Sequence, residues 1–483
     1  MELDKDLRSR QQVRCLVSRA DEAWQTLKGF DQGQIDRIVE AVSRAGADHA
    51  AELAELACRE TGFGNVPDKT AKNLFAARTV YDAIRDMKTI GILREDKARR
   101  TMDVGVPVGV IAALVPSTNP TSTVIYKTMI ALKGGNTVVF SPHPNARECT
   151  VRTVELLQQA VAAAGCPAGA VGCIDPPTQE ALQELMHHPA VRLILATGGP
   201  GMVRAAYSSG KPAIGVGAGN GPAYIHKSAD IPRAVAQIIA SKTFDNGTVC
   251  ASEQSIILEA PIESRVHAEL KAQGGYFLSA DEAAQVAALL LRPNGTINPK
   301  IVGKTACQIA RMAGLTGVPE TARVLVAKET QAGPTRPYSR EKLCPILALF
   351  VEPDEDTVLE KVCQVLENEG SGHTFVMHCT DDAVIRRFAL RVPVSRFLVN
   401  APGATGGIGA TTNLFPALTL GCGAVGGSSS SNNIGPLDLI NIRRVAAGVR
   451  DMPENAGHTT DGDFAVSEET LRRLTEKIMK KLL

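Results

Sequence analysis

The chain has 483 residues, more than one ordinary hydrophobic core holds, and this length predicts two or three domains. Its 52 basic side chains nearly balance the 51 acidic ones, so the net charge of +1 gives no overall field that favours nucleic acid. The 11 cysteines have neither disulfide-framework nor zinc-site spacing and indicate free thiols in a reducing compartment. No secretory signal is visible at the charged N-terminus, and no stretch approaches the ~20 apolar residues of a membrane span, so we expect a soluble, cytoplasmic protein.

The first part of the chain predicts helices. Residues Gln34–Leu56 repeat apolar side chains near one helical face, although Gly46 lies in that face and predicts a break between two helices. A further helix is expected over Leu74–Ile92. The next segment, Arg100–Pro107, alternates like a strand and is polar enough to leave the main body.

From Val108 onward, apolar strand-like runs alternate with helical segments. The runs predict strands buried on both faces at Val108–Pro116, Asn136–Phe140, Val171–Ile174 and Val191–Ala196. The helices expected between them are Asn119–Leu132, Cys149–Ala164 and Thr178–Met186. This alternation predicts βαβ units and a mostly parallel sheet. The turns after the strands would line its carboxyl edge, where open α/β sheets bind nucleotide-type ligands.

A second α/β region is expected from Ser255 to about Ala424. Its strands are predicted at Ser255–Leu258, Leu347–Val351, Thr374–His378 and Phe397–Asn400, with helices between them. A further strand is expected over Leu437–Ala446. Residues 451–466 have the composition of a flexible acidic linker, and the last 17 residues predict an amphipathic helix.

Cys250 lies in a polar loop within the segment SKTFDNGTVCASEQS, rather than in the apolar run typical of a structural cysteine. Gly247 allows backbone amides to approach whatever the sulfur attacks. Cys250 is therefore either a nucleophile or an ordinary loop cysteine. No Ser/His/Asp-type partner lies at a recognisable spacing, so a nucleophile here would depend on backbone amides or a bound cationic cofactor for its acidity.

Other residues carry weaker signals. The glycine turn 198–201 follows a predicted strand and is either a phosphate cradle or a tight turn. Asn119 is either an oxyanion donor or a helix cap. His143 and His373 are flanked by turn residues and expected to be exposed enough to act as acid, base or ligand, and Glu341 carries the same ambiguity.

Taken together, these segments resemble the CoA-acylating branch of the aldehyde dehydrogenase superfamily. The resemblance extends from about Val104 to Ala446 and is carried by VGVIAALVPSTNPTST, VVFSPHPNA, LILATGGPGMV, GVGAGNGPAYI, SKTFDNGTVCASEQS and LTLGCGAVGGSSSSNNIGPLDLINI. It implies an α/β fold with a Rossmann-type cofactor domain, a second α/β catalytic domain and a small oligomerisation hairpin. The implied activity is oxidation of a short aldehyde, acetaldehyde or propionaldehyde, with NAD or NADP and coenzyme A.

The resemblance also assigns roles to single residues. Cys250 would be the nucleophile, and Asn119 would donate to the oxyanion together with the Cys250 amide. His373 would assist the transfer to CoA or contact CoA. The residues implied to bind the nicotinamide cofactor are Ser117, Thr118, Ser141, His143, Thr197, Gly198, Gly199, Gly217, Glu341 and Leu343.

One departure from hydrolytic relatives bears on the mechanism. Those relatives carry a glutamate at the position of Val216, in the run Val216–Asn220, and this chain has no carboxylate there. Without a base to activate water, the Cys250 thioester is expected to await CoA, whose thiol is far more acidic than water.

The resemblance gives a division of the chain as well. Residues 1–96 and 108–240 would form the dinucleotide-binding domain and 241–430 the catalytic domain. Residues 97–107 and 431–450 would form the oligomerisation hairpin and strand of a dimer or tetramer. Residues 467–483 resemble the encapsulation peptides of enzymes packaged in bacterial microcompartments, which bind shell or cargo proteins. The helix would otherwise dock on its own protomer or oligomer, or lie on a membrane.

The sequence is also compatible with three rival functions. A hydrolytic aldehyde dehydrogenase would release free acid, and a catalytically idle cargo scaffold would organise other enzymes through the terminal helix. A reductase of acyl phosphates on the same fold would make CoA irrelevant. Formation of NADH from aldehydes with and without CoA distinguishes the three from the acylating enzyme.

Overall fold

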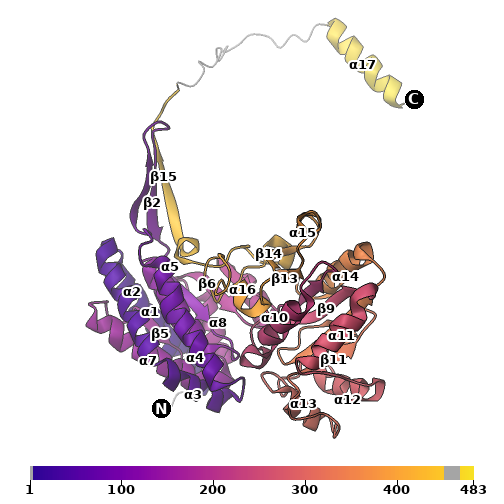
Figure 1. Ribbon diagram of the computed structural model, residues 1–483. Coiled ribbons are helices and arrows are strands. Elements are labelled where there is room, and N and C mark those ends of the chain that lie inside the picture. The colour runs from indigo at the N-terminus through magenta and orange to yellow at the C-terminus, as the bar shows by residue number, and fades with distance from the viewer. Residues whose placement is uncertain (1–3, 451–467, 483) are drawn as a thin grey trace.

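The computed structural model describes residues 4–450 and 468–482 and arranges them around three β-sheets (Figure 1). Two of the sheets are parallel and are packed with helices, and the third is small and antiparallel. The predicted α/β class with mostly parallel sheets is therefore confirmed. None of the helices in the described ranges combines the length and the apolar character needed to cross a membrane.

The first parallel sheet has five strands in the order β5–β4–β3–β6–β7. These strands are β3 (Val110–Leu114), β4 (Thr137–Ser141), β5 (Val171–Cys173), β6 (Val191–Thr197) and β7 (Ala213–Val216). Every residue of β3 and β4 is buried, as expected for apolar strands covered on both faces. The strand order reverses between β3 and β6, and such a reversal opens a crevice at the carboxyl edge of the sheet.

The helices of this half pack around the sheet. They are α1 (Lys5–Leu27), α2 (Gln32–Asp48), α3 (Ala50–Thr61), α4 (Val66–Leu74), the π-helical turn η1 (Phe75–Thr79), α5 (Val80–Ile84), α6 (Pro120–Lys133), α7 (Arg147–Ala163), α8 (Gln179–His187) and α9 (Pro200–Tyr207). α6 is buried at every position, and both α2 and α7 pack against it. It directly follows β3 and therefore begins at the crevice.

Two predicted helices differ from the observed ones. The break expected at Gly46 lies instead at His49, between α2 and α3. Gly46 continues the helix and makes room for α6, because a Cβ at this position would lie 2.9 Å from Cγ2 of Ile125. The helix expected over Leu74–Ile92 ends at Ile84, and the chain then enters a strand that the sequence pattern did not reveal.

The second parallel sheet has seven strands in the order β10–β11–β12–β9–β8–β13–β14. They are β8 (Gly221–Ile225), β9 (Glu253–Glu259), β10 (Gly275–Phe277), β11 (Val324–Lys328), β12 (Ile346–Glu352), β13 (Gly372–His378) and β14 (Val394–Val399). Its helices are α10 (Ile231–Thr243), α11 (Glu263–Ala272), α12 (Ala280–Leu290), α13 (Ala306–Met312), α14 (Glu355–Asn368), α15 (Asp382–Ala389) and α16 (Gly403–Gly407). β8, β10 and β11 were not predicted. Because β8 belongs to this sheet, the boundary expected at residue 240 is wrong, and the second half begins near residue 220.

The third sheet projects from the body (Figure 1). Its antiparallel strands lie in the order β1–β2–β15 and are β1 (Gly91–Asp96), β2 (Thr101–Pro107) and β15 (Ile440–Ala446). Residues 91–96 therefore belong to this sheet. The prediction placed them in the dinucleotide-binding domain instead. β15 is exposed at every position after Ile440, including Ile442 and Val445.

The C-terminal helix predicted from the sequence is present as α17 (Glu468–Leu482). Its residues 468–479 are all exposed, and Figure 1 shows the helix apart from the other elements. Leu471, Leu474 and Ile478 are each more than half exposed, at 54%, 53% and 54%. The predicted linker over residues 451–466 lies outside the described residues.

Candidate active site

A cavity of about 330 Å³ lies where the two halves meet. Residues 116–119 and 197–200, which follow β3 and β6, line it from the first half. Residues 216–218 and 248–250 line it just before β8 and β9 begin. The cavity therefore joins the carboxyl edge of the five-stranded sheet to the amino edge of the seven-stranded sheet. All the predicted site residues line it except Ser141 and His373.

An unusual loop carries Cys250 into this cavity. After α10, the residues Asp245, Asn246 and Gly247 all have positive φ angles, of 48°, 53° and 79°. Aspartate, asparagine and glycine are the residue types that tolerate this left-handed conformation most readily. The DNG sequence thus permits a tight turn that reverses the chain before β9 and leaves Cys250 half-buried on the cavity wall.

The Cys250 thiol is a poor acid in the protein without ligands. Burial raises its pKa to about 12, and the Glu341 carboxylate adds to the effect, whereas the Cys250 amide opposes it. No imidazole or other base is hydrogen-bonded to the sulfur among the contacts of the described residues. A cation bound in the cavity would favour the thiolate, which is the form that attacks carbonyl groups.

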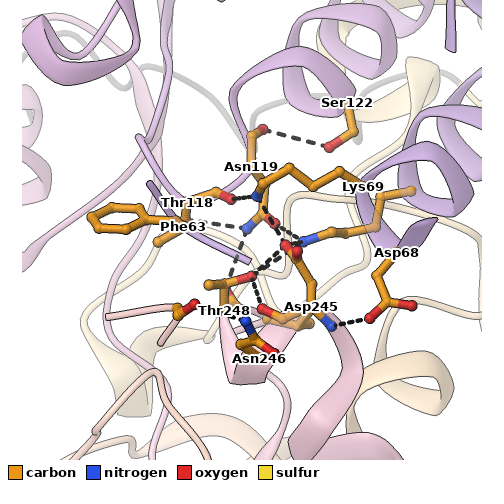
Figure 2. A network of polar contacts seen from close by, with 12 residues as sticks. Phe63, Asp68, Lys69, Thr118, Asn119, Ser122, Asp245, Asn246 and Thr248 are labelled. Carbon is orange, nitrogen blue, oxygen red and sulfur yellow. Dashed lines mark hydrogen bonds and ion pairs between the residues drawn. The ribbon is translucent and has the colours of Figure 1, made fainter. Parts of the chain in front are cut away.

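Asn119 lies across the cavity from the first half and precedes α6. Asn119 occupies the N-cap position of α6, but its side chain makes no capping bond to the helix. The Nδ2 amide donates instead to Thr118 Oγ1 at 3.1 Å and to the carbonyl of Thr248 at 3.3 Å (Figure 2). Thr248 is two residues before Cys250, so the carboxamide faces the cysteine loop.

Sequence reasoning missed the charged network beneath this carboxamide. Lys69 and Lys72 of α4 both donate to Oδ2 of Asp245, and Lys72 also donates to Oδ1 of Asn119. Thr248 Oγ1 donates to the same carboxylate oxygen at 2.6 Å, and the Asn65 amide donates to Oδ1 at 2.9 Å. Figure 2 shows Asp245 at the centre of these contacts. The sequence signal that was available is the pair of lysines three residues apart on one helical face.

Most of the residues predicted to bind the nicotinamide cofactor line the cavity. Ser117, Thr118, His143, Gly217 and Leu343 line the cavity, and so does the turn Thr197–Gly199 at the start of α9. A Cβ at Gly199 or Gly201 would meet no atom within 4 Å, so the backbone here is open to a phosphate group. Ser141 lies at the end of β4, is 6% exposed and does not reach the cavity.

Glu341 is the carboxyl group that lines the cavity among the described residues. Its Oε1 accepts a hydrogen bond from the Gly219 amide at 2.9 Å. Burial and the neighbouring Glu369 carboxylate raise its pKa to about 8, so it is largely protonated at neutral pH. Val216 also lines the cavity, and the position where hydrolytic relatives are expected to hold a base therefore presents only an apolar side chain.

His373 does not have the exposure expected for it. It is the second residue of β13, is completely buried and does not line the cavity. Burial lowers its pKa to about 3, and the Arg396 cation contributes, so the imidazole is neutral. The Gly219 backbone lies between His373 and Cys250, because a Cβ at Gly219 would be 2.1 Å from the Cys250 carbonyl oxygen and 3.2 Å from His373 Nε2.

Metal chemistry receives no support from side-chain clustering. Within residues 4–450 and 468–482, no group of three His, Cys, Asp or Glu side chains is arranged to hold a metal ion. The cavity wall presents a thiol, a carboxamide, a carboxyl group and an open glycine turn.

Comparison with known sequences extends these observations. The model of the aldehyde dehydrogenase family matches residues 6–281. The bifunctional aldehyde-alcohol dehydrogenase AdhE of Escherichia coli (strain K12) is 44% identical over 446 residues, which cover 91% of this chain and 50% of that protein. A succinate-semialdehyde dehydrogenase (acetylating) of Clostridium kluyveri is 37% identical over 433 residues, which cover 90% and 95%. The chain thus spans about half the length of the bifunctional relative and nearly all of the second.

Solved structures agree with the sequence comparison. An acetylating aldehyde dehydrogenase from Geobacillus thermoglucosidasius has a TM-score of 0.92 and 50% identity, covering 94% of this chain and 100% of its own. A propionaldehyde dehydrogenase from the Clostridium phytofermentans fucose utilisation bacterial microcompartment has a TM-score of 0.82 and 30% identity, covering 90% and 97%. A Rhodopseudomonas palustris propionaldehyde dehydrogenase with bound CoA and an acylated cysteine has a TM-score of 0.81 and 29% identity, covering 90% and 97%. The chain belongs to the aldehyde dehydrogenase family.

Proposed function

We propose that the protein oxidises a short aliphatic aldehyde, acetaldehyde or propionaldehyde, to its acyl-CoA with NAD+ and coenzyme A. The observation that carries the proposal is the placement of Cys250 and Asn119 on one cavity whose wall holds Val216 in place of a base. Two acylating relatives, which this chain matches over nearly their whole length, support the same reaction class. The sequence contains no clear selector between NAD and NADP.

In the proposed reaction, the Cys250 thiolate forms a bond to the carbonyl carbon of the aldehyde. The negative charge that develops on the carbonyl oxygen is stabilised by the Asn119 Nδ2 amide and by the Cys250 backbone amide. Bound NAD+ supplies the acceptor for the hydride that leaves the same carbon, and a thioester on Cys250 remains. The hydroxyls of Ser117 and Thr197 and the glycine turn, which is open at Gly199, would hold this cofactor.

Release of the acyl group then depends on a thiol nucleophile. The CoA thiolate attacks the thioester carbonyl, the bond to Cys250 breaks, and the Cys250 thiolate is regenerated with acyl-CoA as product. A thiol with a pKa of roughly 8.5 needs little help to ionise, whereas water requires a strong base. Glu341 accepts a hydrogen bond from the Gly219 amide, and we assign it to the nicotinamide cofactor rather than to the activation of water. His373 receives no step, because its imidazole lies outside the cavity.

The test of this function is the dependence of NADH formation on CoA. With C2 to C4 aldehydes and without CoA, NADH formation is expected to stop after about one equivalent per active site, because the thioester persists. Addition of CoA is expected to restore steady turnover, with acyl-CoA detected by mass spectrometry. Rapid formation of free acid without CoA contradicts the proposal, and so does an absence of NADH under both conditions.

The projecting sheet is proposed to hold a dimer or tetramer together. Exposed apolar residues of β15, including Ile442 at 49% and Val445 at 45%, support an interface there, and the strand leaves an unpaired edge. The mass in light scattering is expected to equal two or four protomers, and a monomeric mass contradicts this.

We propose that α17 binds a shell or cargo protein of a bacterial microcompartment. Its apolar residues form one stripe, its other side is basic, and a single isolated helix of this length needs a groove for stability. The similarity to an enzyme of a fucose utilisation microcompartment supports this setting. The apolar stripe of α17 and this similarity therefore support the same proposed location, a bacterial microcompartment.

Deletion of residues 463–483 is expected to leave aldehyde oxidation unchanged and to abolish co-purification with microcompartment shells. As a matched pair in the full-length chain, Leu471→Glu with Ile478→Glu should release the enzyme from shells, whereas Arg472→Glu with Glu476→Lys should not, because the second pair spares the stripe. Encapsulation that persists after the deletion contradicts the proposal.

A further inference from the structure

Two lysines of α4 are buried beneath the cysteine loop and take no part in the proposed reaction. Lys69 and Lys72 are each 2% exposed, and both contact the fully buried Asp245 carboxylate. Burying a cation is costly unless it is paired, so a second lysine on a carboxylate that one lysine already neutralises calls for a reason. The reason lies in what each ammonium group contacts besides Asp245.

The other contacts of the two lysines differ. Lys69 donates to the carbonyl oxygen of Thr118 at 2.9 Å. Lys72 donates to Oδ1 of Asn119 and to Thr248 Oγ1, the latter at 3.2 Å. With Asp245, Lys72 therefore has three acceptors for its three N–H groups, and it holds no free proton to deliver to a substrate.

The contact with Asn119 fixes which end of the carboxamide faces the cavity. An ammonium group only donates, so it can bond the carboxamide oxygen and not the nitrogen. Once Oδ1 is held on Lys72, Nδ2 must lie on the opposite side, where it donates to Thr118 Oγ1 and Thr248 O over 3.1 and 3.3 Å. Both acceptors are neutral, and a bond from the amide to an anion is about twice as strong, so these bonds are readily exchanged when the oxyanion forms.

We propose that Lys72, anchored by Asp245, is a positioning residue that holds the Asn119 carboxamide with its amide hydrogens toward the oxyanion formed at Cys250. Without Lys72 the carboxamide is free to flip, and the flipped form presents oxygen lone pairs to a negative charge. The inference rests on the role proposed above for Asn119, and it adds a residue from α4, a helix distant in sequence from both Asn119 and Cys250.

A double-mutant cycle tests the proposal. Lys72→Met is expected to lower kcat for NADH formation about 100-fold, the usual scale for losing one oxyanion donor, with KM for the aldehyde within a few-fold of wild type. In an Asn119→Ala background, the same substitution is expected to lower kcat by less than about threefold, because the group it positions is gone. Lys72→Gln keeps a donor for Oδ1 without the charge and is expected to regain at least about tenfold over Lys72→Met.

Two controls separate positioning from damage to the loop. Alkylation of Cys250 by iodoacetamide creates no oxyanion, so its rate in Lys72→Met should stay within about threefold of wild type. Lys69→Met removes the other cation from the same carboxylate. The loss of kcat that it causes is expected to be at least about tenfold smaller than the loss caused by Lys72→Met.

Equal losses of kcat from Lys72→Met in the two backgrounds overturn the proposal, as does an equal loss in Lys69→Met or no recovery in Lys72→Gln. Wild-type turnover with CoA is measured first, so failure of the proposed function is seen independently of these ratios.

Discussion

Replacing Cys250 with alanine is expected to lower CoA-dependent NADH formation by at least about 10⁴-fold, because no other group can form the thioester. No other thiol lines the cavity among the described residues, and the remaining polar groups there are amides, hydroxyls, a lysine, a histidine and a carboxyl group. The loss should be the same for C2 to C4 aldehydes. The rate is measured as the initial increase in NADH absorbance with saturating CoA.

The controls for this experiment come from the same chain. Cys15→Ala removes an exposed thiol of α1 and should leave the rate unchanged. Binding of NAD+ to Cys250→Ala, followed by calorimetry, should stay within about threefold of wild type, since alanine leaves the cavity shape almost intact. Activity that survives in Cys250→Ala contradicts the assignment of the nucleophile.

Replacing Asp245 with alanine is expected to lower the free energy of unfolding by about 3–5 kcal/mol, since it leaves buried cations without their partner. Lys69 and Lys72 both lose an ion pair, and alanine also tolerates the φ angle of 48° less well than aspartate. Urea denaturation measures the change. Asp31→Ala, which removes a carboxylate from the exposed capping box of α2, should cost only about 1 kcal/mol.

The contribution of Asp245 also has a defined pH dependence. Burial opposes its charged form, but the Lys72 and Lys69 cations outweigh burial and lower its pKa below 3.8. A carboxylate with a lowered pKa stabilises the fold fully above its unfolded pKa, and this stabilisation is lost as the pH falls through the folded pKa. The stability difference between wild type and Asp245→Ala should therefore be constant near neutrality and shrink only below about pH 4. A difference of less than about 1 kcal/mol at pH 7 contradicts the account.

The sequence was sufficient to predict the strands that are apolar throughout and bounded by turns. β3, β4 and β6 were predicted within a few residues because apolar runs between turns have few alternatives in an α/β chain. The pairing of Asn119 with Cys250 came from the resemblance to a known family, because no spacing rule brings together residues 131 positions apart.

Long-range packing explains the residues that the sequence did not reveal. Gly46 looked like a helix break, yet its role is a close approach to Ile125 of another helix. His373 looked like a loop histidine, but β13 begins before it and buries it. Lys72 and Asp245 carry no motif, and their partnership exists only because α4 packs beneath the cysteine loop.

The meeting of two sheet edges at one cavity makes the protein suited to laboratory evolution. The turns at 116–119 and 197–200 are attached to one sheet, whereas Val302, Ile408 and Leu418 reach the cavity from segments outside any strand or β-bridge. Random substitution at these three positions would reshape the space available to the aldehyde without altering a strand pairing. Libraries confined to them should therefore yield many folded variants, with substrate preference changing independently of affinity for the nucleotide.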